Sequence, residues 1–174
     1  MSRNQWAELA SRPVPSSVHP PVKLILRDRT CFEGRSFGAR RTVQGEVVFN
    51  TGMTGYVEAL TDPSYRGQIL VLTYPLQGNY GVPRGKFESR RVQVQGLVVQ
   101  HYTDTPSHHL AVHSLGAWLK AEGVPAMDGI CAFGVAQENG DHFAYARRYA
   151  LARTILQIVF CVIDGGVDDL CGIA

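Results

Sequence analysis

The segment TDPSYRGQ, residues 61–68, holds the residues whose types and order most clearly suggest a group presented for binding. Pro63 fixes its own backbone angle, and a loop held in this way leaves the small hydroxyl of Ser64 available for hydrogen bonds. We therefore expect Ser64 to contact a ligand at the surface. The alternative is that Ser64 merely caps a turn.

Cys131, in the stretch GICAFG, is a second candidate because it is placed like a nucleophile at a sharp strand-to-helix turn. Such a turn needs small residues around the nucleophile, and Phe133 occupies one of those positions. A cysteine nucleophile also needs a histidine that is oriented by an acid or an amide. His142 is the histidine that follows Cys131, and no acidic residue comes closely after it. We therefore favour a buried structural thiol.

Metal and phosphate chemistry receive weaker support from the sequence. His109 and His113 are four residues apart and could share a metal on one helix face, with His108 beside them, but no glutamate or third ligand accompanies them. We favour surface histidines. The four cysteines form no C-x-x-C pair, so we predict reduced thiols rather than a zinc site. The GNYG stretch at 78–81 lacks the ending of a phosphate-binding loop and predicts a tight turn.

Short strands and glycine-rich turns must position these residues. The apolar run QILVLTYPL predicts a strand inside a sheet, and GYVEALTDP predicts a short helical or turn segment that ends at Pro63. Helical spacing begins after Thr105, with Ser107 as the expected N-cap and Gly123 as the residue after the helix. Further strands are expected in KLILRD and TCFEG, joined by a turn at Asp28-Arg29, and in GEVVFNT, RVQVQGLVVQ and VPAMDGI. Arg29 would then adopt a positive φ, at a cost of about 1 kcal/mol. The pattern predicts a mixed α/β, strand-rich domain whose curved sheets are backed by one or two helices.

The bulk composition excludes several classes of protein. The chain has 174 residues, of which 45% are apolar and 18% charged, as in a globular domain. A net charge of +2 with scattered basic residues argues against nucleic-acid binding. The apolar run TILQIVFCVI has about half the length of a membrane span, so we expect a buried strand or helix and no membrane partner. The four prolines in residues 1–21 predict a disordered arm, and an organelle-targeting segment is the alternative.

One long block of this sequence resembles a known family. The run FGARRTVQGEVVFNTGMTGYVEALTDPSYRGQILVLTYPLQGNYGVP, residues 37–83, is similar to the N-terminal domain of the small, glutamine-using chain of carbamoyl-phosphate synthase. KFESRRVQVQGLVVQHY and KAEGVPAMDGI continue the likeness, which covers about residues 22–130. The expected fold is therefore that of this N-terminal domain. After residue 130 the family's Asp-Thr-Arg segment is replaced by Cys131-Ala132-Phe133, so we treat 131–174 as a divergent, partly packed tail.

In that family the small chain hydrolyses glutamine and passes ammonia to a large chain, which makes carbamoyl phosphate from bicarbonate and ATP. The resemblance implies two partners, the large chain (or a fused synthetase domain) and an amidotransferase domain. It implies no cofactor in this chain, because the partner uses ATP and bicarbonate. Ser64 is the one residue carried over, as a contact of the glutamine site.

The catalytic residues of the amidotransferase domain have no counterpart here, so we expect no catalytic residue in this chain and leave open whether it acts as an enzyme. The pathway would be pyrimidine or arginine biosynthesis, in the cytoplasm or alternatively the mitochondrion. The rival interpretations are a non-catalytic interaction module and a truncated product that lacks the amidotransferase domain.

Overall fold

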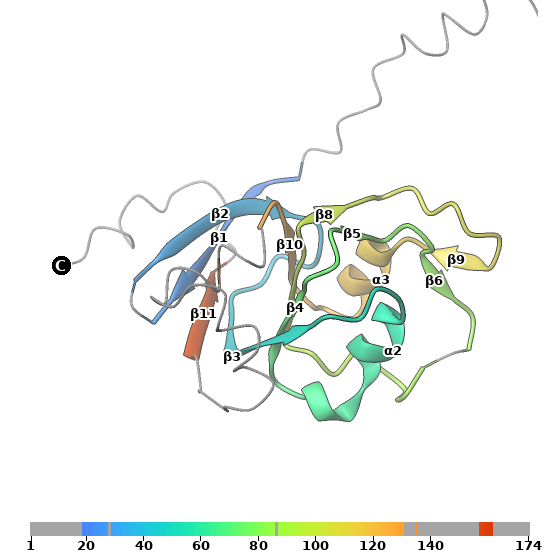
Figure 1. Cartoon of the computed structure of the whole chain (residues 1–174), viewed down its shortest axis with the longest axis horizontal. Helices are drawn as coiled ribbons and strands as arrows, with labels where there is room; N and C mark the ends of the chain where they lie inside the picture. The colour runs from blue at the N-terminus through green and yellow to red at the C-terminus, as the bar shows by residue number, and fades with distance from the viewer. Residues whose placement is uncertain (1–18, 28, 86, 131–134, 136–156, 162–174) are drawn as a thin grey trace, which may run out of the picture.

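The computed structural model describes residues 19–27, 29–85, 87–130, 135 and 157–161, the last five by backbone alone. In Figure 1 the long strands gather on one side of the molecule, and the helices α2 and α3 lie on the other. The described elements, in chain order, are β1 (Pro21–Leu26), β2 (Cys31–Ser36), β3 (Val43–Asn50), α2 (Tyr56–Thr61), the 3-10 helix η1 (Pro63–Tyr65), β4 (Ile69–Leu72), β5 (Leu76–Gln77), β6 (Val82–Pro83), β7 (Gly96–Val98), β8 (His101–Tyr102), β9 (Ala111–His113), α3 (Leu115–Ala121), β10 (Ala126–Asp128) and β11 (Gln157–Cys161).

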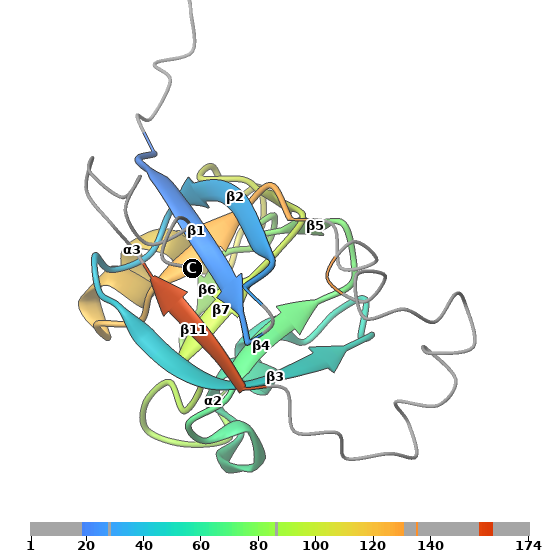
Figure 2. The same ribbon diagram turned by 90° about the vertical axis from the view of Figure 1, so that its left-hand side faces the viewer.

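Seven of these strands form a closed barrel in the order β1-β11-β3-β4-β7-β10-β2. Strand β11 lies antiparallel between β1 and β3, and β4 lies parallel between β3 and β7. The ring closes because β2 pairs with both β10 and β1. Figure 2 shows β1, β11 and β3 running side by side. Closure pairs both edges of each of these strands, which removes the exposed edge of an open sheet.

The position of β4 explains why its sequence is apolar at every residue and does not alternate with polar residues. All four of its residues are buried. Leu70 and Leu72 belong to a core cluster that faces the helices, whereas Ile69 and Val71 belong to a second cluster that fills the barrel. Because successive side chains of a strand point to opposite faces, both faces of β4 are covered. The predicted interior strand is confirmed.

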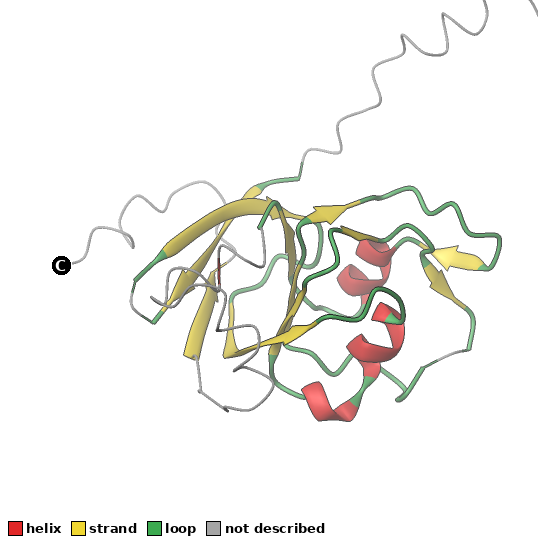
Figure 3. Ribbon diagram, in the orientation of Figure 1, coloured by secondary structure: helices red, strands yellow, loops and turns green. Residues whose placement is uncertain are grey.

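The two described α-helices pack on one side of the barrel (Figure 3). Both are short, with six residues in α2 and seven in α3, so their stability depends on the apolar faces that they bury. Val57 and Leu60 of α2 join Leu115 and Leu119 of α3 in the cluster that faces the helices. The prediction of a mixed, strand-rich α/β domain with a curved sheet backed by helices is confirmed.

The expected turn between the first two strands is also confirmed. Strands β1 and β2 pair antiparallel, and Arg29 in the turn has a φ of 70°. The Arg29 N–H donates to Leu26 O at 3.0 Å, and the Leu26 N–H donates to Thr30 O at 2.9 Å. These hydrogen bonds offset the strain of a left-handed arginine.

The start of the second helix was predicted wrongly. Helix α3 begins at Leu115, and Ser114 rather than Ser107 caps it, because the Ser114 hydroxyl accepts a hydrogen bond from the Ala117 N–H. Residues 111–113 instead form β9 and pair with β6. The end of the helix was correct, since Gly123 follows the C-cap with a φ of 71°.

The strand predicted over residues 91–100 is confirmed only at 96–98. In the preceding part of that segment, the Gln93 and Gln95 N–H groups donate to carbonyls of Leu60 and Gln68. The backbone of Gln93 and Gln95 therefore bonds to the end of α2 and to the residue range that follows η1, and not to a neighbouring strand. None of the helices described is long and apolar enough to span a membrane. Of the arm predicted over residues 1–21, residues 1–18 lie outside the described residues, whereas Pro21 already belongs to β1 and pairs with Arg35, so the ordered domain begins earlier than predicted. The predicted tail lies outside the described residues apart from Val135 and β11.

Candidate functional site

Ser64 lies at the surface, in the single 3-10 turn that follows α2. Helix α2 ends at Thr61 because Asp62 takes an extended conformation, with φ −69° and ψ 122°. Pro63 then occupies the first position of η1, where its missing N–H costs nothing. The Asp62 carboxylate accepts a hydrogen bond from the Ser64 N–H at 2.8 Å. The sequence order Asp-Pro-Ser therefore builds a capped turn that leaves Ser64 exposed.

The charge of Asp62 depends on the same turn. Hydrogen bonds from the Ser64 N–H and then from the Ser64 hydroxyl hold the pKa of Asp62 below its usual value of 3.8. The carboxylate is therefore ionised at neutral pH. The Ser64 hydroxyl that donates to this carboxylate keeps its lone pairs for an external donor.

Tyr65 anchors the turn to the end of β3. Its hydroxyl accepts a hydrogen bond from the Asn50 side-chain amide at 3.2 Å, and its carbonyl accepts from the Gln68 N–H at 3.1 Å. The Asn50 side-chain oxygen accepts from the Gly52 N–H at 2.7 Å. Asn50 thus links the η1 turn to the loop that precedes α2. Residues 51–54 of that loop are exposed, and the Met53 side chain is 71% exposed.

Thr61 fixes the end of α2 through hydrogen bonds of its hydroxyl and its carbonyl. Its hydroxyl donates to Val57 O at 2.9 Å and accepts from the Glu88 N–H at 3.0 Å. Its carbonyl accepts from the Ser89 hydroxyl at 2.6 Å. Thr61 is fully buried, and these bonds satisfy its hydroxyl and its carbonyl. The segment at 88–89 is thereby held against the base of the Ser64 turn.

Tyr80 fixes the start of α2. The N-cap position is Gly55, which has a φ of 81° and no side chain to accept a hydrogen bond. The Tyr80 hydroxyl accepts instead from the Gly55 N–H at 3.0 Å and from the Tyr56 N–H at 2.9 Å. The Tyr80 ring stacks on the Tyr56 ring with 4.0 Å between centroids. Burial raises the pKa of Tyr80, so its phenol stays neutral.

Sequence reasoning identified Ser64 and Pro63 but missed the residues that hold them. The GNYG stretch was correctly predicted to be a turn, since the Gly81 N–H donates to Gly78 O at 3.0 Å. Nothing in its spacing pointed to a hydroxyl that caps a helix more than twenty residues earlier. Gly55 did carry a signal, because a glycine N-cap has no side chain to accept a hydrogen bond from the first N–H groups of the helix, so a residue elsewhere in the chain must accept it. Asn50 and Thr61 carried no comparable signal.

The other candidates play no part in this arrangement. Cys131 and His142 lie outside the described residues. His108, His109 and His113 are exposed, and the rings of His108 and His109 stack on one another. Within the described ranges, no group of three or more His, Cys, Asp or Glu side chains could hold a metal ion.

The 51–54 loop and the η1 turn are linked through Asn50, whose side chain bonds to the Gly52 N–H and to the Tyr65 hydroxyl. They present an exposed hydroxyl and backbone groups on a support fixed by Asn50, Thr61 and Tyr80. Such a surface can accept and donate hydrogen bonds to a small polar ligand without reorganising. Ligands of this kind often lie at a boundary between domains, where a second surface encloses them.

Comparison with known proteins places this arrangement in a family. The family described as carbamoyl-phosphate synthase small chain, CPSase domain, matches residues 24–135. Multifunctional protein URA2 of Saccharomyces cerevisiae is 53% identical over 130 residues, which are 68% of this chain and 6% of that protein. The carbamoyl phosphate synthase arginine-specific small chain of Yarrowia lipolytica is 53% identical over 125 residues, 66% of this chain and 28% of that protein.

Multifunctional protein pyr-3 of Neurospora crassa is 50% identical over 122 residues, 63% of this chain and 7% of that protein. The chain therefore spans less than a third of the length of each of these relatives. The Ser64 turn and its supports all lie inside the matched segment. The chain belongs to the carbamoyl-phosphate synthase small-chain family, through the CPSase domain of that chain.

Proposed function

We propose that this domain completes the glutamine site of a carbamoyl-phosphate synthase by contributing the Ser64 hydroxyl, and that it docks on the synthetase partner. The observation that carries the proposal is the exposure of Ser64 in a capped, proline-held turn within a member of this family. An amidotransferase domain, joined or separate, would supply the nucleophile for hydrolysis. The large synthetase chain or fused domain would use the released ammonia with ATP and bicarbonate.

The chemistry of the turn suits an amino-acid substrate. Glutamine carries an ammonium group, a carboxylate and a side-chain amide, and an uncharged hydroxyl can bond to each of them. The Ser64 hydroxyl faces the Asp62 carboxylate, so its remaining lone pairs favour a donor such as the ammonium or the amide N–H. A turn already fixed by Pro63 loses little entropy when the ligand binds.

A chimera tests the proposal in a complete enzyme. Residues 22–130 would replace the aligned segment of the Yarrowia lipolytica arginine-specific small chain, and carbamoyl phosphate synthesis would be measured with glutamine or with ammonia. Loss of a hydrogen bond to a charged substrate group costs about 1.5–3 kcal/mol, which corresponds to about tenfold or more in binding. We therefore expect Ser64→Ala to raise the KM for glutamine at least about tenfold and to leave the ammonia-dependent rate unchanged.

Ser107→Ala is the matched control, because Ser107 is also exposed and its hydroxyl bonds only to a backbone carbonyl, Asn79 O. This variant should keep the KM for glutamine of the unmodified chimera. A Ser64→Ala chimera with an unchanged KM would show that Ser64 does not contact glutamine. If that chimera still assembled with its synthetase, the domain would serve only as an interaction module.

A further inference from the structure

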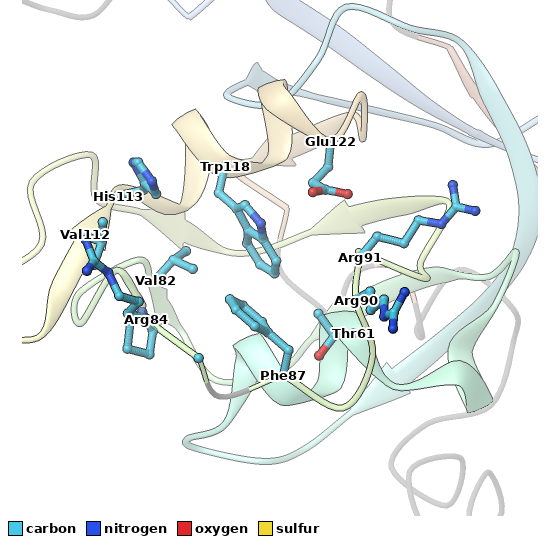
Figure 4. Close-up of a pocket in the computed structure, with 12 residues that line it drawn as sticks. Thr61, Val82, Arg84, Phe87, Arg90, Arg91, Val112, His113, Trp118 and Glu122 are labelled. Atoms are coloured by element: carbon cyan, nitrogen blue, oxygen red, sulfur yellow. The ribbon is translucent and has the colours of Figure 1, made fainter.

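A cleft with no assigned role lies beside α2 and α3. Its volume is about 390 Å³, and its walls come from the end of α2, residues 82–85, 87 and 90–91, strand β9 and helix α3 with its C-cap Glu122. Figure 4 shows the rings of Phe87 and Trp118 at its centre, with Arg84 on one side and Arg90 and Arg91 on the other. It is separate from the Ser64 hydroxyl, although Thr61 contributes to both regions.

The centre of the cleft is apolar and open to solvent. The Phe87 and Trp118 rings lie 5.7 Å apart between centroids, at an angle of 35°. The Phe87 side chain is 41% exposed and that of Val112 is 46% exposed. Leu110, two residues before Val112 in the chain, is 54% exposed. Large apolar side chains grouped at a surface in this way are typical of a protein contact.

The rim of the cleft is positively charged. Arg84, Arg90 and Arg91 are all exposed, and the described part of the chain provides no ion-pair partner for any of them. Glu122 is the one acidic residue among the lining side chains, and His113 completes the titratable groups there. Three guanidinium groups against one carboxylate favour an anionic occupant, since each can bind a carboxylate through two parallel N–H groups.

The polar groups of the cleft distinguish a protein segment from a small molecule. Sites for small molecules bury a few polar groups that converge on the ligand. Here the buried hydroxyl of Thr61 is already bonded to Val57 O and the Glu88 N–H, and the arginines stand at the exposed rim. Aromatic residues and arginine around an apolar centre are instead the residues enriched at protein interfaces.

We infer that this cleft binds an acidic segment of a partner protein. An aromatic or aliphatic side chain of the segment packs on Phe87 and Trp118, and its flanking carboxylates pair with Arg84 on one side and with Arg90 and Arg91 on the other. The inference does not depend on the proposed glutamine contact, because it uses no property of the Ser64 hydroxyl. An unchanged KM in the Ser64→Ala chimera would therefore leave this inference unaffected, and failure of the peptide to bind would leave the glutamine contact unaffected.

A designed peptide tests the site directly. Acetyl-Glu-Asp-Phe-Asp-Glu-amide would be titrated into the ¹⁵N-labelled 174-residue chain, and amide shifts would be followed by NMR. We expect the largest shifts in residues 84–91 and 112–118. Phe87→Ala and Arg90→Glu should each weaken binding at least about tenfold, the effect typical of a central contact. Both side chains are exposed, so neither change should impair folding, which the unperturbed shifts of the barrel would verify.

Matched controls distinguish binding of an acidic peptide segment from binding of small anions and from non-specific charge attraction. Arg27→Glu reverses an exposed charge that does not line the cleft, and it should leave binding unchanged. A peptide with alanine in place of phenylalanine should bind at least about tenfold more weakly. Equal weakening by Arg27→Glu, or equal binding of the alanine peptide, would overturn the inference. So would absence of peptide binding, and binding of pyrophosphate or ATP without the peptide would identify a site for small anions instead.

Discussion

Three neighbouring residues have different roles in the turn at Ser64: Asp62 and Pro63 fix the backbone, and Ser64 exposes its hydroxyl. Pro63 limits the backbone, and the Asp62 carboxylate accepts from the Ser64 N–H, which otherwise would have no partner in the turn. Ser64 therefore needs no bulk or charge of its own to hold its position. The same division makes the position of the hydroxyl depend on the ionisation of Asp62.

The first prediction concerns pH. Because the pKa of Asp62 in the folded chain lies below 3.8, its carboxylate stabilises the turn above that pH, and this contribution is lost as the pH falls through the lower folded value. The Ser64 amide proton, followed by NMR from pH 7 to pH 2, should shift with a midpoint below 3.8. The step should vanish in Asp62→Asn, which keeps an acceptor oxygen but does not titrate. A midpoint at or above 3.8 would show that the carboxylate is not bonded to Ser64.

At the scale of elements, α2 depends on a residue from another part of the chain. Helix α2 has six residues and glycine as its N-cap, so the N–H groups of its first turn have no acceptor on the capping residue itself. Tyr80 meets this need from the turn between β5 and β6. The helix that carries the Ser64 turn at its end is therefore positioned by tertiary packing at its beginning.

The second prediction follows from this cap. Tyr80→Phe keeps the stacked ring but removes the acceptor, so we expect a loss of about 1 kcal/mol in the free energy of unfolding, similar to the loss of a helix cap. Hydrogen exchange of the Gly55 and Tyr56 amides should become faster. Tyr74→Phe is the control, because Tyr74 is 37% exposed and its hydroxyl caps none of the helices that the structure describes. Equal stability of the two variants would contradict a capping role for Tyr80.

The sequence predicted those elements whose signals are local. The apolar run of β4, the positive φ at Arg29 and the glycine after α3 each follow from a few neighbouring residues. The early start proposed for α3 failed because residues 110–113 fit a helical pattern, whereas pairing with β6 keeps 111–113 extended. The supports of Ser64 could not be predicted in the same way, since Asn50, Thr61 and Tyr80 act through contacts that form only when distant segments pack.

At the scale of the whole molecule, β4 joins two cores into one structure. Its alternate residues belong to the cluster inside the barrel and to the cluster under the helices, so neither cluster can lose β4 without disturbing the other. We therefore expect the barrel and the Ser64 turn to unfold together in a single transition. The barrel in turn depends on how its ring of strands is completed.

Completion of that ring depends on β11, which lies after residues 24–135, the segment that the family model matches. Val159 pairs with Ile25 of β1 and with Gln44 of β3, so its backbone lies between two neighbours. Proline at this position removes an N–H from a strand that is paired on both sides, and we expect Val159→Pro to destabilise the domain by about 2–4 kcal/mol. Urea unfolding followed by circular dichroism measures the loss, and Val159→Thr, which keeps the N–H and the branched side chain, should change stability far less. Equal unfolding midpoints for the proline variant and the unmodified chain would mean that β1 and β3 do not depend on β11 in solution, and that the other six strands are equally stable as an open sheet.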